Sequence, residues 1–178
     1  MTTPRVELTE AELREGLTAC LAVPRWVEDV VGRAPFASLL ELMDVAAAAA
    51  TPLSPEEVHQ ALAHHPRVGE KVRGAGTSAD FARSEQATSQ SDDEGLAAAL
   101  VEGNRAYEER FGRIFLIRAA GRDRRTILAE LRRRLALDEV AEAAVVASEL
   151  RDIALLRIPQ LFGHLDHHSG YNDPEAAE

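Results

Sequence analysis

The sequence predicts an all-α fold, a single-domain bundle of about eight or nine helices. Its 178 residues suit one domain with a sizeable core. Hydrophobic residues make up 46% of the chain but aromatic residues only 4%, so the core must consist mainly of alanine, leucine and valine. Long runs rich in Ala, Leu, Glu and Arg, which are strong helix formers, favour helices over strands.

Three helices are predicted in the N-terminal part of the chain. Thr9 and Glu12 form a capping-box pattern, which predicts a helix over residues 9–21. A proline opens a second, shorter helix at residues 24–31. A third is expected to begin at a proline and to run through an alanine-rich stretch, over residues 35–50.

The central part is predicted to contain two shorter helices joined by a loop. Ser54 and Glu57 form a second capping box, and the helix that they begin is expected to end at His64-His65-Pro66. Glycine residues interrupt residues 68–77, which predicts a loop. A short helix is then expected over residues 79–89.

The C-terminal half is predicted to be helical, apart from one connection and the end of the chain. Three helices are expected, over residues 92–110, 122–135 and 138–162. The apolar run at 114–117 is too short for periodicity to distinguish a strand from a buried turn. The folded domain is expected to cover residues 1–163, and the polar residues 164–178 are expected to form a flexible tail.

Composition and charge exclude several classes of protein. The chain has 20 basic and 30 acidic residues, a net charge of −10, which argues against a nucleic-acid-binding protein. No apolar run is long enough to span a bilayer, and the N-terminus has no signal-peptide pattern. A single cysteine, Cys20, cannot form an intramolecular disulfide. We therefore expect a cytoplasmic protein with no membrane partner.

The junction His64-His65-Pro66 is the first candidate for chemistry. Proline disfavours the helical conformation in the residue before it, so His65 is expected at a helix end with its ring at an opening. Histidine can give or take a proton near neutral pH, although a histidine at a helix end is more often a surface or capping residue. His64 should point elsewhere, because adjacent helical residues do not share a face.

A carboxylate and a guanidinium are also expected to face the interior. Phe81 and Glu85 are four residues apart, so an apolar anchor would turn the Glu85 carboxylate inward, although a solvated helix charge is the simpler interpretation. Arg157 shares an apolar stripe with Leu150 and Ile153. A buried guanidinium needs an anion, which is either Glu85 or a similar internal acid, or the carboxylate of a ligand.

Two other groups of residues were weighed as sites. His164, His167 and His168 have a spacing that could hold a transition metal, but no closed ligand set is visible, so no metal site is predicted. Cys20 lies on an apolar face and is interpreted as a core residue rather than a nucleophile.

Several segments together point to one family. They are Trp26-Val27, Arg33-Ala34-Pro35-Phe36, His64-His65-Pro66-Arg67-Val68-Gly69-Glu70, Ser84-Glu85-Gln86, Tyr107-Glu108-Glu109-Arg110-Phe111-Gly112, Phe115-Leu116-Ile117-Arg118-Ala119-Ala120-Gly121-Arg122 and Leu155-Leu156-Arg157-Ile158. In this order and spacing, the chain from about Leu8 to Phe162 resembles the 2-oxo-4-hydroxy-4-carboxy-5-ureidoimidazoline (OHCU) decarboxylases.

The resemblance implies a fold, an activity and a set of site residues. It implies an all-helical single domain, usually a homodimer, that converts OHCU to (S)-allantoin in urate degradation with neither metal nor organic cofactor. The family's catalytic positions fall on His65 as proton donor, Glu85 as the group that fixes it or engages substrate, and Arg157 as the group that binds anionic oxygen. Its substrate-binding positions fall on Pro66, Ser84, Gln86, Phe115, Leu116, Ile117, Arg118 and Ala119.

The chain departs from the family pattern at two positions. Ala82 stands where the family commonly has serine, which could weaken one substrate hydrogen bond, and Leu137 replaces a frequent asparagine at a helix cap. Two other functions stay open. One is a helical module that binds allantoin or a related purine breakdown product without turnover. The other is a metal-dependent hydrolase that uses the histidine-rich tail.

Overall fold

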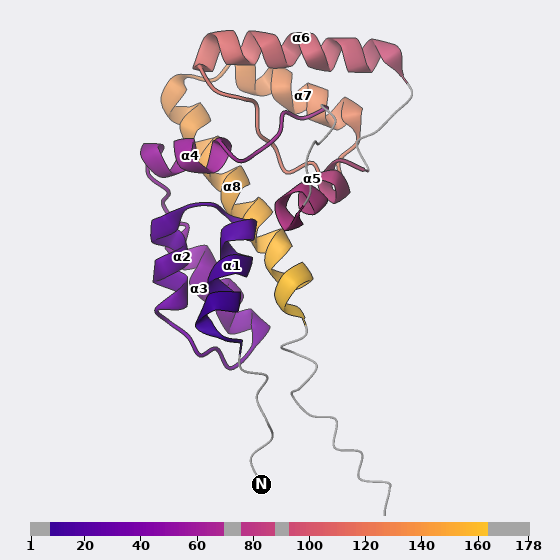
Figure 1. The fold of residues 1–178 in the computed structure, drawn as a ribbon. Coiled ribbons are helices and arrows are strands. Elements are labelled where there is room, and N and C mark those ends of the chain that lie inside the picture. Colours follow the sequence, from indigo (N-terminus) through magenta and orange to yellow (C-terminus); the bar gives the residue numbers. More distant parts are fainter. Residues whose placement is uncertain (1–7, 70–75, 88–92, 164–178) are drawn as a thin grey trace, which may run out of the picture.

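A computed structural model of the protein describes residues 8–69, 76–87 and 93–163. Over these residues the chain forms one domain of eight α-helices, and no strand occurs among them, which confirms the predicted all-α fold (Figure 1). The helices are α1 (Glu10–Cys20), α2 (Pro24–Val31), α3 (Leu39–Ala49), α4 (Pro55–Leu62), α5 (Thr77–Ala87), α6 (Glu94–Phe111), α7 (Arg124–Leu135) and α8 (Glu139–Phe162). Within the described ranges, every helix is too short or too polar to cross a membrane.

Most helix boundaries follow from the capping residues that the sequence shows. Thr9 and Ser54 each form the predicted capping box with a glutamate three residues later, at the start of α1 and α4. Asp138 caps α8 through the amide of Ala141, and Gly112 ends α6 in the left-handed conformation, with φ +65°.

The start of α3 differs from the prediction. The helix begins at Leu39 rather than at Pro35, because the Ser38 hydroxyl accepts a hydrogen bond from the Glu41 amide and makes Ser38 the N-cap. The carboxylate of Glu41 also binds the Ala37 amide, 2.6 Å away, which fixes the non-helical chain before the cap. A serine N-cap thus overrode the proline that the prediction used as the first helical residue.

The described residues form two hydrophobic clusters, and α8 runs between them. The larger cluster is formed by α1, α2, α3, α4 and most of α8. The smaller one is formed by α6, α7 and the connection between them. In Figure 1, α8 crosses the molecule diagonally from the side of α6 and α7 to the side of α1 and α3. Groups fixed to α8 therefore have defined positions relative to both clusters.

The α6–α7 connection resolves the ambiguity over residues 114–117. It is neither a strand nor a helical turn, but irregular chain that is buried at Phe115, Leu116 and Ile117. Leu116 belongs to the larger cluster, whereas Phe115 and Ile117 belong to the smaller one. Successive side chains join different clusters because this segment passes between the two clusters and packs against both.

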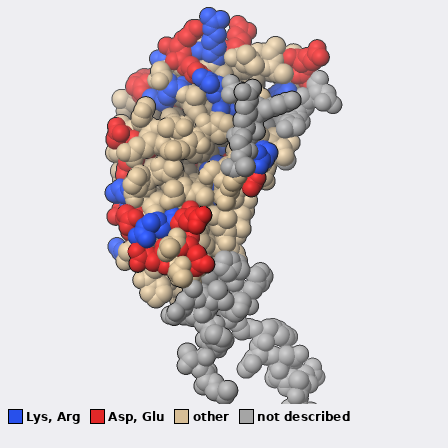
Figure 2. All heavy atoms as spheres, in the orientation of Figure 1, with Lys and Arg blue, Asp and Glu red and all other residues tan. Residues whose placement is uncertain are grey.

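Charged side chains are mixed on the face drawn in Figure 2. Acidic and basic groups gather toward its upper and lower ends, and a broad uncharged band lies between them. This face carries no continuous basic surface of the kind that binds nucleic acid.

Candidate functional site

Arg157 and Glu85 form a buried, bidentate ion pair. The Nε atom of Arg157 on α8 donates to Oε1 of Glu85 on α5 over 2.6 Å, and Nη2 donates to Oε2 over 2.9 Å. Only 4% of the Arg157 side chain and 14% of the Glu85 side chain are exposed. The guanidinium also lies 5.3 Å from the centre of the Phe81 ring, one turn before Glu85. The predicted apolar anchor thus turns Glu85 inward, and Glu85 is the anion that Arg157 requires.

The guanidinium keeps hydrogen-bonding capacity beyond this pair. Its Nη1 atom donates to the backbone carbonyl of Cys20 over 3.3 Å, so three of the five N–H groups of Arg157 have protein partners. The other two N–H groups have no partner among the described residues. Cys20 itself is fully buried, and burial raises its thiol pKa to about 12, which fits the predicted core role.

His65 presents a free ring nitrogen toward the interior. It follows the last turn of α4, and its Nδ1 atom lies 2.9 Å from the Ala61 carbonyl. A carbonyl oxygen only accepts, so the proton of the neutral ring is on Nδ1 and the Nε2 lone pair is free. The Nε2 atom is buried and has no hydrogen-bond partner in the described part of the chain. A buried polar atom without a partner is costly, which makes Nε2 the position for a ligand's hydrogen-bond donor.

The electrostatic environment keeps His65 neutral. The pKa of His65 falls from 6.5 to about 4, mainly because the ring is buried and also because the positive charge of Arg157 opposes a second one nearby. The charge of Arg157 thus acts on the His65 ring. The structure pairs Arg157 with Glu85 and places His65 within reach of the Arg157 charge, although these residues are far apart in the sequence.

The loop that carries His65 is fixed by α5 and α6. Arg67 donates to both carboxylate oxygens of Glu108, over 2.5 and 2.9 Å. Asn104 donates to the Val68 carbonyl over 2.9 Å, and the Gly69 amide donates to Gln86 Oε1 over 3.3 Å. Gln86, a predicted substrate-binding residue, thus also joins α5 to this loop.

The other predicted binding positions differ in how far they are buried. Pro66 is half-buried, whereas Ser84 is exposed on α5. Phe115, Leu116, Ile117 and Ala119 are all buried, and Arg118 is half-buried. The Arg118 amide donates to Glu149 over 2.6 Å, and the Leu116 carbonyl accepts from Arg134 over 2.7 Å.

Sequence reasoning missed the buried charges that hold this region together. Arg134 and Glu142 are fully buried, and Tyr107 donates its hydroxyl proton to Glu142. A usable signal exists, because Arg134 follows Ile127 and Leu131 at helical spacing, as a charge on an apolar stripe. The same signal identified Arg157. Asn104 is likewise a polar residue on an apolar stripe, between Leu100 and Tyr107 on the buried face of α6.

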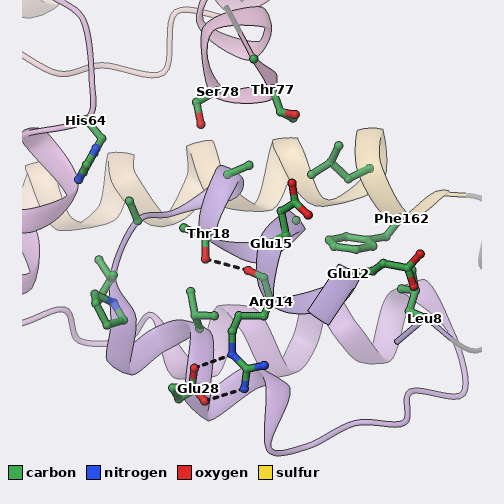
Figure 3. Close-up of a pocket in the computed structure, with 18 residues that line it drawn as sticks. Leu8, Glu12, Arg14, Glu15, Thr18, Glu28, His64, Thr77, Ser78 and Phe162 are labelled. Atoms are coloured by element: carbon green, nitrogen blue, oxygen red, sulfur yellow. Dashed lines mark hydrogen bonds and ion pairs between the residues drawn. The ribbon is translucent and has the colours of Figure 1, made fainter. Parts of the chain in front are cut away.

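A large hollow lies elsewhere on the described part of the molecule. It measures about 1110 Å³ and is lined by α1, α2, the start of α5 and the end of α8 (Figure 3). His64 lines it, together with Thr18, Ser78 and Phe162, whereas His65, Glu85 and Arg157 do not. The two adjacent histidines therefore serve different surroundings, as predicted.

No metal centre is found in the part of the chain that the structure describes. No group of three or more His, Cys, Asp and Glu side chains there could hold an ion. The tail histidines, His164, His167 and His168, lie outside the described residues, as does the predicted flexible tail at 164–178.

The fold and the site define a class of protein, and comparisons define the family. The class is a helical domain with a buried acid–base site, in which a neutral histidine lies under the influence of an arginine–glutamate pair. A family model described as OHCU decarboxylase matches residues 6–159. The chain belongs to the OHCU decarboxylase family.

Individual relatives agree with this assignment. The uric acid degradation bifunctional protein TTL of Arabidopsis thaliana is 34% identical over 107 residues, which are 58% of this chain and 33% of the relative. The chain thus spans about a third of that relative's length.

Two solved structures share the fold. A crystal structure of OHCU decarboxylase in the presence of (S)-allantoin is 24% identical, with a TM-score of 0.72, and covers 84% of this chain and 98% of its own. A crystal structure of (S)-allantoin synthase is 17% identical, with a TM-score of 0.63, and covers 86% of this chain and 51% of its own.

Proposed function

We propose that the protein is a carboxy-lyase that converts OHCU to (S)-allantoin in urate degradation. Family membership over residues 6–159 supports the reaction class. The observation that carries the proposal is the buried Nε2 atom of His65, which has no partner among the described residues and lies within reach of the Arg157 charge; two N–H groups of that guanidinium also have no partner among these residues. Together these groups offer a proton acceptor and an anion-binding group in one water-poor place.

Arg157 would bind anionic oxygen of the substrate. The charges of Arg157 and Glu85 nearly cancel, so the site with a bound carboxylate would carry a net charge of about −1. That carboxylate would lie next to the N–H groups of Arg157 that Glu85 does not use. Glu85 holds the guanidinium plane through two hydrogen bonds, which fixes the direction of the remaining donors. Glu85 is thus expected to orient Arg157 and to accept from substrate N–H or hydroxyl groups.

The reaction itself needs an electron acceptor, which the substrate's ring supplies. When carbon dioxide leaves, the electron pair of the broken C–C bond moves into the ring C=N bond, and the ring nitrogen takes a proton from solvent. The enol that results becomes allantoin when its hydroxyl loses a proton and the neighbouring ring carbon gains one. The proposal therefore includes neither a metal nor an organic cofactor.

His65 is suited to this second step. With a pKa near 4 it is neutral at pH 7, so it must accept a proton before it can donate one. The free Nε2 atom can accept the hydroxyl proton and, as imidazolium, pass it to one face of the adjacent carbon. Protonation from one face would give (S)-allantoin rather than a racemate.

The decisive experiment compares two neighbouring histidines. His65→Asn should lower kcat/KM for OHCU freshly generated from urate by about 10²- to 10⁴-fold, and should yield racemic allantoin from the uncatalysed reaction. His64→Asn, at an exposed position outside the site, should keep the rate and the chirality of the wild type. A folded His65→Asn variant with near wild-type rate and chirality would contradict the assignment.

The same experiment separates the enzyme from a binding module. A wild-type chain that binds (S)-allantoin but does not accelerate OHCU decay would show the alternative function.

Two further expectations accompany the proposal. The family resemblance supports a homodimer, which sedimentation equilibrium would test, and the single cysteine supports a cytoplasmic location.

A further inference from the structure

We propose that Glu149 is a positioning residue that fixes the backbone of residues 116–119 in the site. The inference rests on the proposed function and on the family resemblance, which puts substrate-binding positions at Phe115 to Ala119. The segment has no regular secondary structure, so its backbone geometry depends on the few groups that bind it. Glu149 on α8 binds it at its centre, at the Arg118 amide.

The contact is short and charge-assisted. The Arg118 N–H donates to Glu149 Oε2 over 2.6 Å, and only 12% of the Glu149 side chain is exposed. The second oxygen, Oε1, lies 3.4 Å from Nη1 of Arg122, near the outer limit for a hydrogen bond. The backbone amide is therefore the closer partner of this carboxylate, and the Arg122 guanidinium is the looser one.

Other contacts restrict the segment on both sides of Arg118. Arg134 donates to the Leu116 carbonyl over 2.7 Å, and the Arg122 amide donates to the Ala119 carbonyl over 3.0 Å. Arg134 is itself held by Glu142 of α8. Two acids of α8 thus fix two neighbouring parts of one irregular segment, one directly and one through an arginine.

These acids lie on the same helix as Arg157. Glu142 and Glu149 are seven residues apart, close to two turns, and Arg157 follows eight residues after Glu149, about 12 Å further along the helix axis. One rigid helix therefore sets the distance between the guanidinium and the backbone at 116–118. This arrangement explains why an acid is present at position 149, where it contributes no group to the reacting atoms.

Glu149 can be tested without removing the core of the protein. Glu142 and Arg134 are fully buried, so substituting either one endangers the fold. Glu149 is only half-buried, so substituting it is less of a risk to the fold. Arg122→Gln is the matched control, because it removes the ion pair with Glu149 and leaves the hydrogen bond from the Arg118 amide in place.

The experiment uses the full chain and four proteins: wild type, Glu149→Ala, Glu149→Gln and Arg122→Gln. Glu149→Ala should raise KM for OHCU and Kd for (S)-allantoin about 10- to 100-fold, as expected for a lost hydrogen bond to a charged group. Glu149→Gln keeps an acceptor oxygen and should recover most of that loss. Arg122→Gln should stay within about twofold of the wild type, because an ion pair of this kind contributes little.

Amide hydrogen exchange supplies a readout that does not depend on activity. Glu149→Ala should lower the exchange protection of Arg118 and its neighbours selectively, and Glu149→Gln should restore it. A merely structural role would instead lower protection throughout the domain and leave KM unchanged. Wild-type affinity and protection at Arg118 in Glu149→Ala would overturn the proposal.

The outcomes also separate this inference from the proposed function. If the wild type binds (S)-allantoin without turnover, the decarboxylase assignment fails, whereas affinity and exchange still test Glu149. If the wild type neither binds nor turns over, the positioning role fails together with the function on which it rests. If Arg122→Gln loses as much as Glu149→Ala, the ion pair rather than the amide contact is responsible.

Discussion

A single imidazole determines the pH behaviour of the site. His65 donates from Nδ1 to the Ala61 carbonyl and leaves Nε2 without a partner, in a place where burial and Arg157 both oppose a positive charge. A ligand carboxylate would offset the charge of Arg157 and raise the pKa of His65 toward neutrality. The free protein therefore holds a base, and ligand binding makes that base a better proton carrier.

The low pKa of His65 also makes stability depend on pH. In the unfolded chain His65 takes up a proton near pH 6.5, but in the folded protein only near pH 4. Between these values the unfolded state binds more protons, so stability decreases as the pH falls. His65 should cost up to about 3 kcal/mol of unfolding free energy across this window. Urea unfolding at pH 7 and pH 4.5 measures it.

His65→Asn is the control for that measurement. The variant lacks the titrating group, so its unfolding free energy should fall less between the two pH values than that of the wild type. Carboxylates elsewhere titrate equally in both proteins and cancel in the comparison. Equal pH dependence in the two proteins would show that His65 titrates normally in the fold.

At the scale of elements, the contact between α6 and α7 depends on one glycine. A Cβ atom built on Gly103 of α6 would lie 2.2 Å from Cδ2 and 3.3 Å from Cγ of Leu131 on α7. Leu131 is fully buried, so its side chain has no free space into which it could move. The two helices can approach closely only because position 103 has no side chain.

Gly103→Ala should therefore destabilise the protein despite the better helix propensity of alanine. Overpacking should cost about 1–3 kcal/mol, against a propensity gain of about 1 kcal/mol. Gly95→Ala, in the exposed first turn of the same helix, carries the propensity gain without a contact to α7. Thermal unfolding of both variants measures the difference in stability. If the Gly103→Ala protein is as stable as the Gly95→Ala protein, then the two helices can move apart at no cost.

The same scale shows which boundaries the sequence could and could not predict. The capping boxes at Thr9 and Ser54 and the glycine at 112 were sufficient, because each satisfies backbone groups within a few residues. The predicted start of α3 was wrong because Pro35 and Ser38 are both suitable for beginning a helix, and the contacts of Glu41 favour Ser38. Local competition of this kind is not visible in periodicity.

At the scale of the whole molecule, a buried charge network joins α6, α7 and α8. Arg134 binds Glu142 through Nε and Nη2 and donates Nη1 to the Leu116 carbonyl, and Tyr107 also donates to Glu142. Burial of Tyr107 is the larger cause, and its hydrogen bond to Glu142 the next, of a pKa raised to about 12. The network is placed where the smaller cluster meets α8, so it ties the two cores together.

Breaking this network from one side should be among the most destabilising single changes. Glu142→Ala leaves the Arg134 charge buried without its carboxylate, which should cost about 3–5 kcal/mol. Glu109→Ala, on α6, removes an ion pair with Arg105 in which both side chains are mostly exposed, and should cost less than about 1 kcal/mol. Urea unfolding of both variants tests this, and similar losses would show that the buried pair is not critical.

The sequence by itself determined the all-α class and most helix boundaries, and it pointed to His65, Glu85 and Arg157 as candidate site residues. Helix formation and capping depend on neighbours in the chain, and the family resemblance depends on residue order, so both can be read from the sequence. The tertiary structure alone decided that Glu85 is the partner of Arg157, that His65 is neutral with a free Nε2 atom, and that Glu149 binds the Arg118 amide. These facts depend on burial and on groups far apart in the chain, such as Glu85 and Arg157, which are 72 residues apart, and only the packing of the helices fixes them.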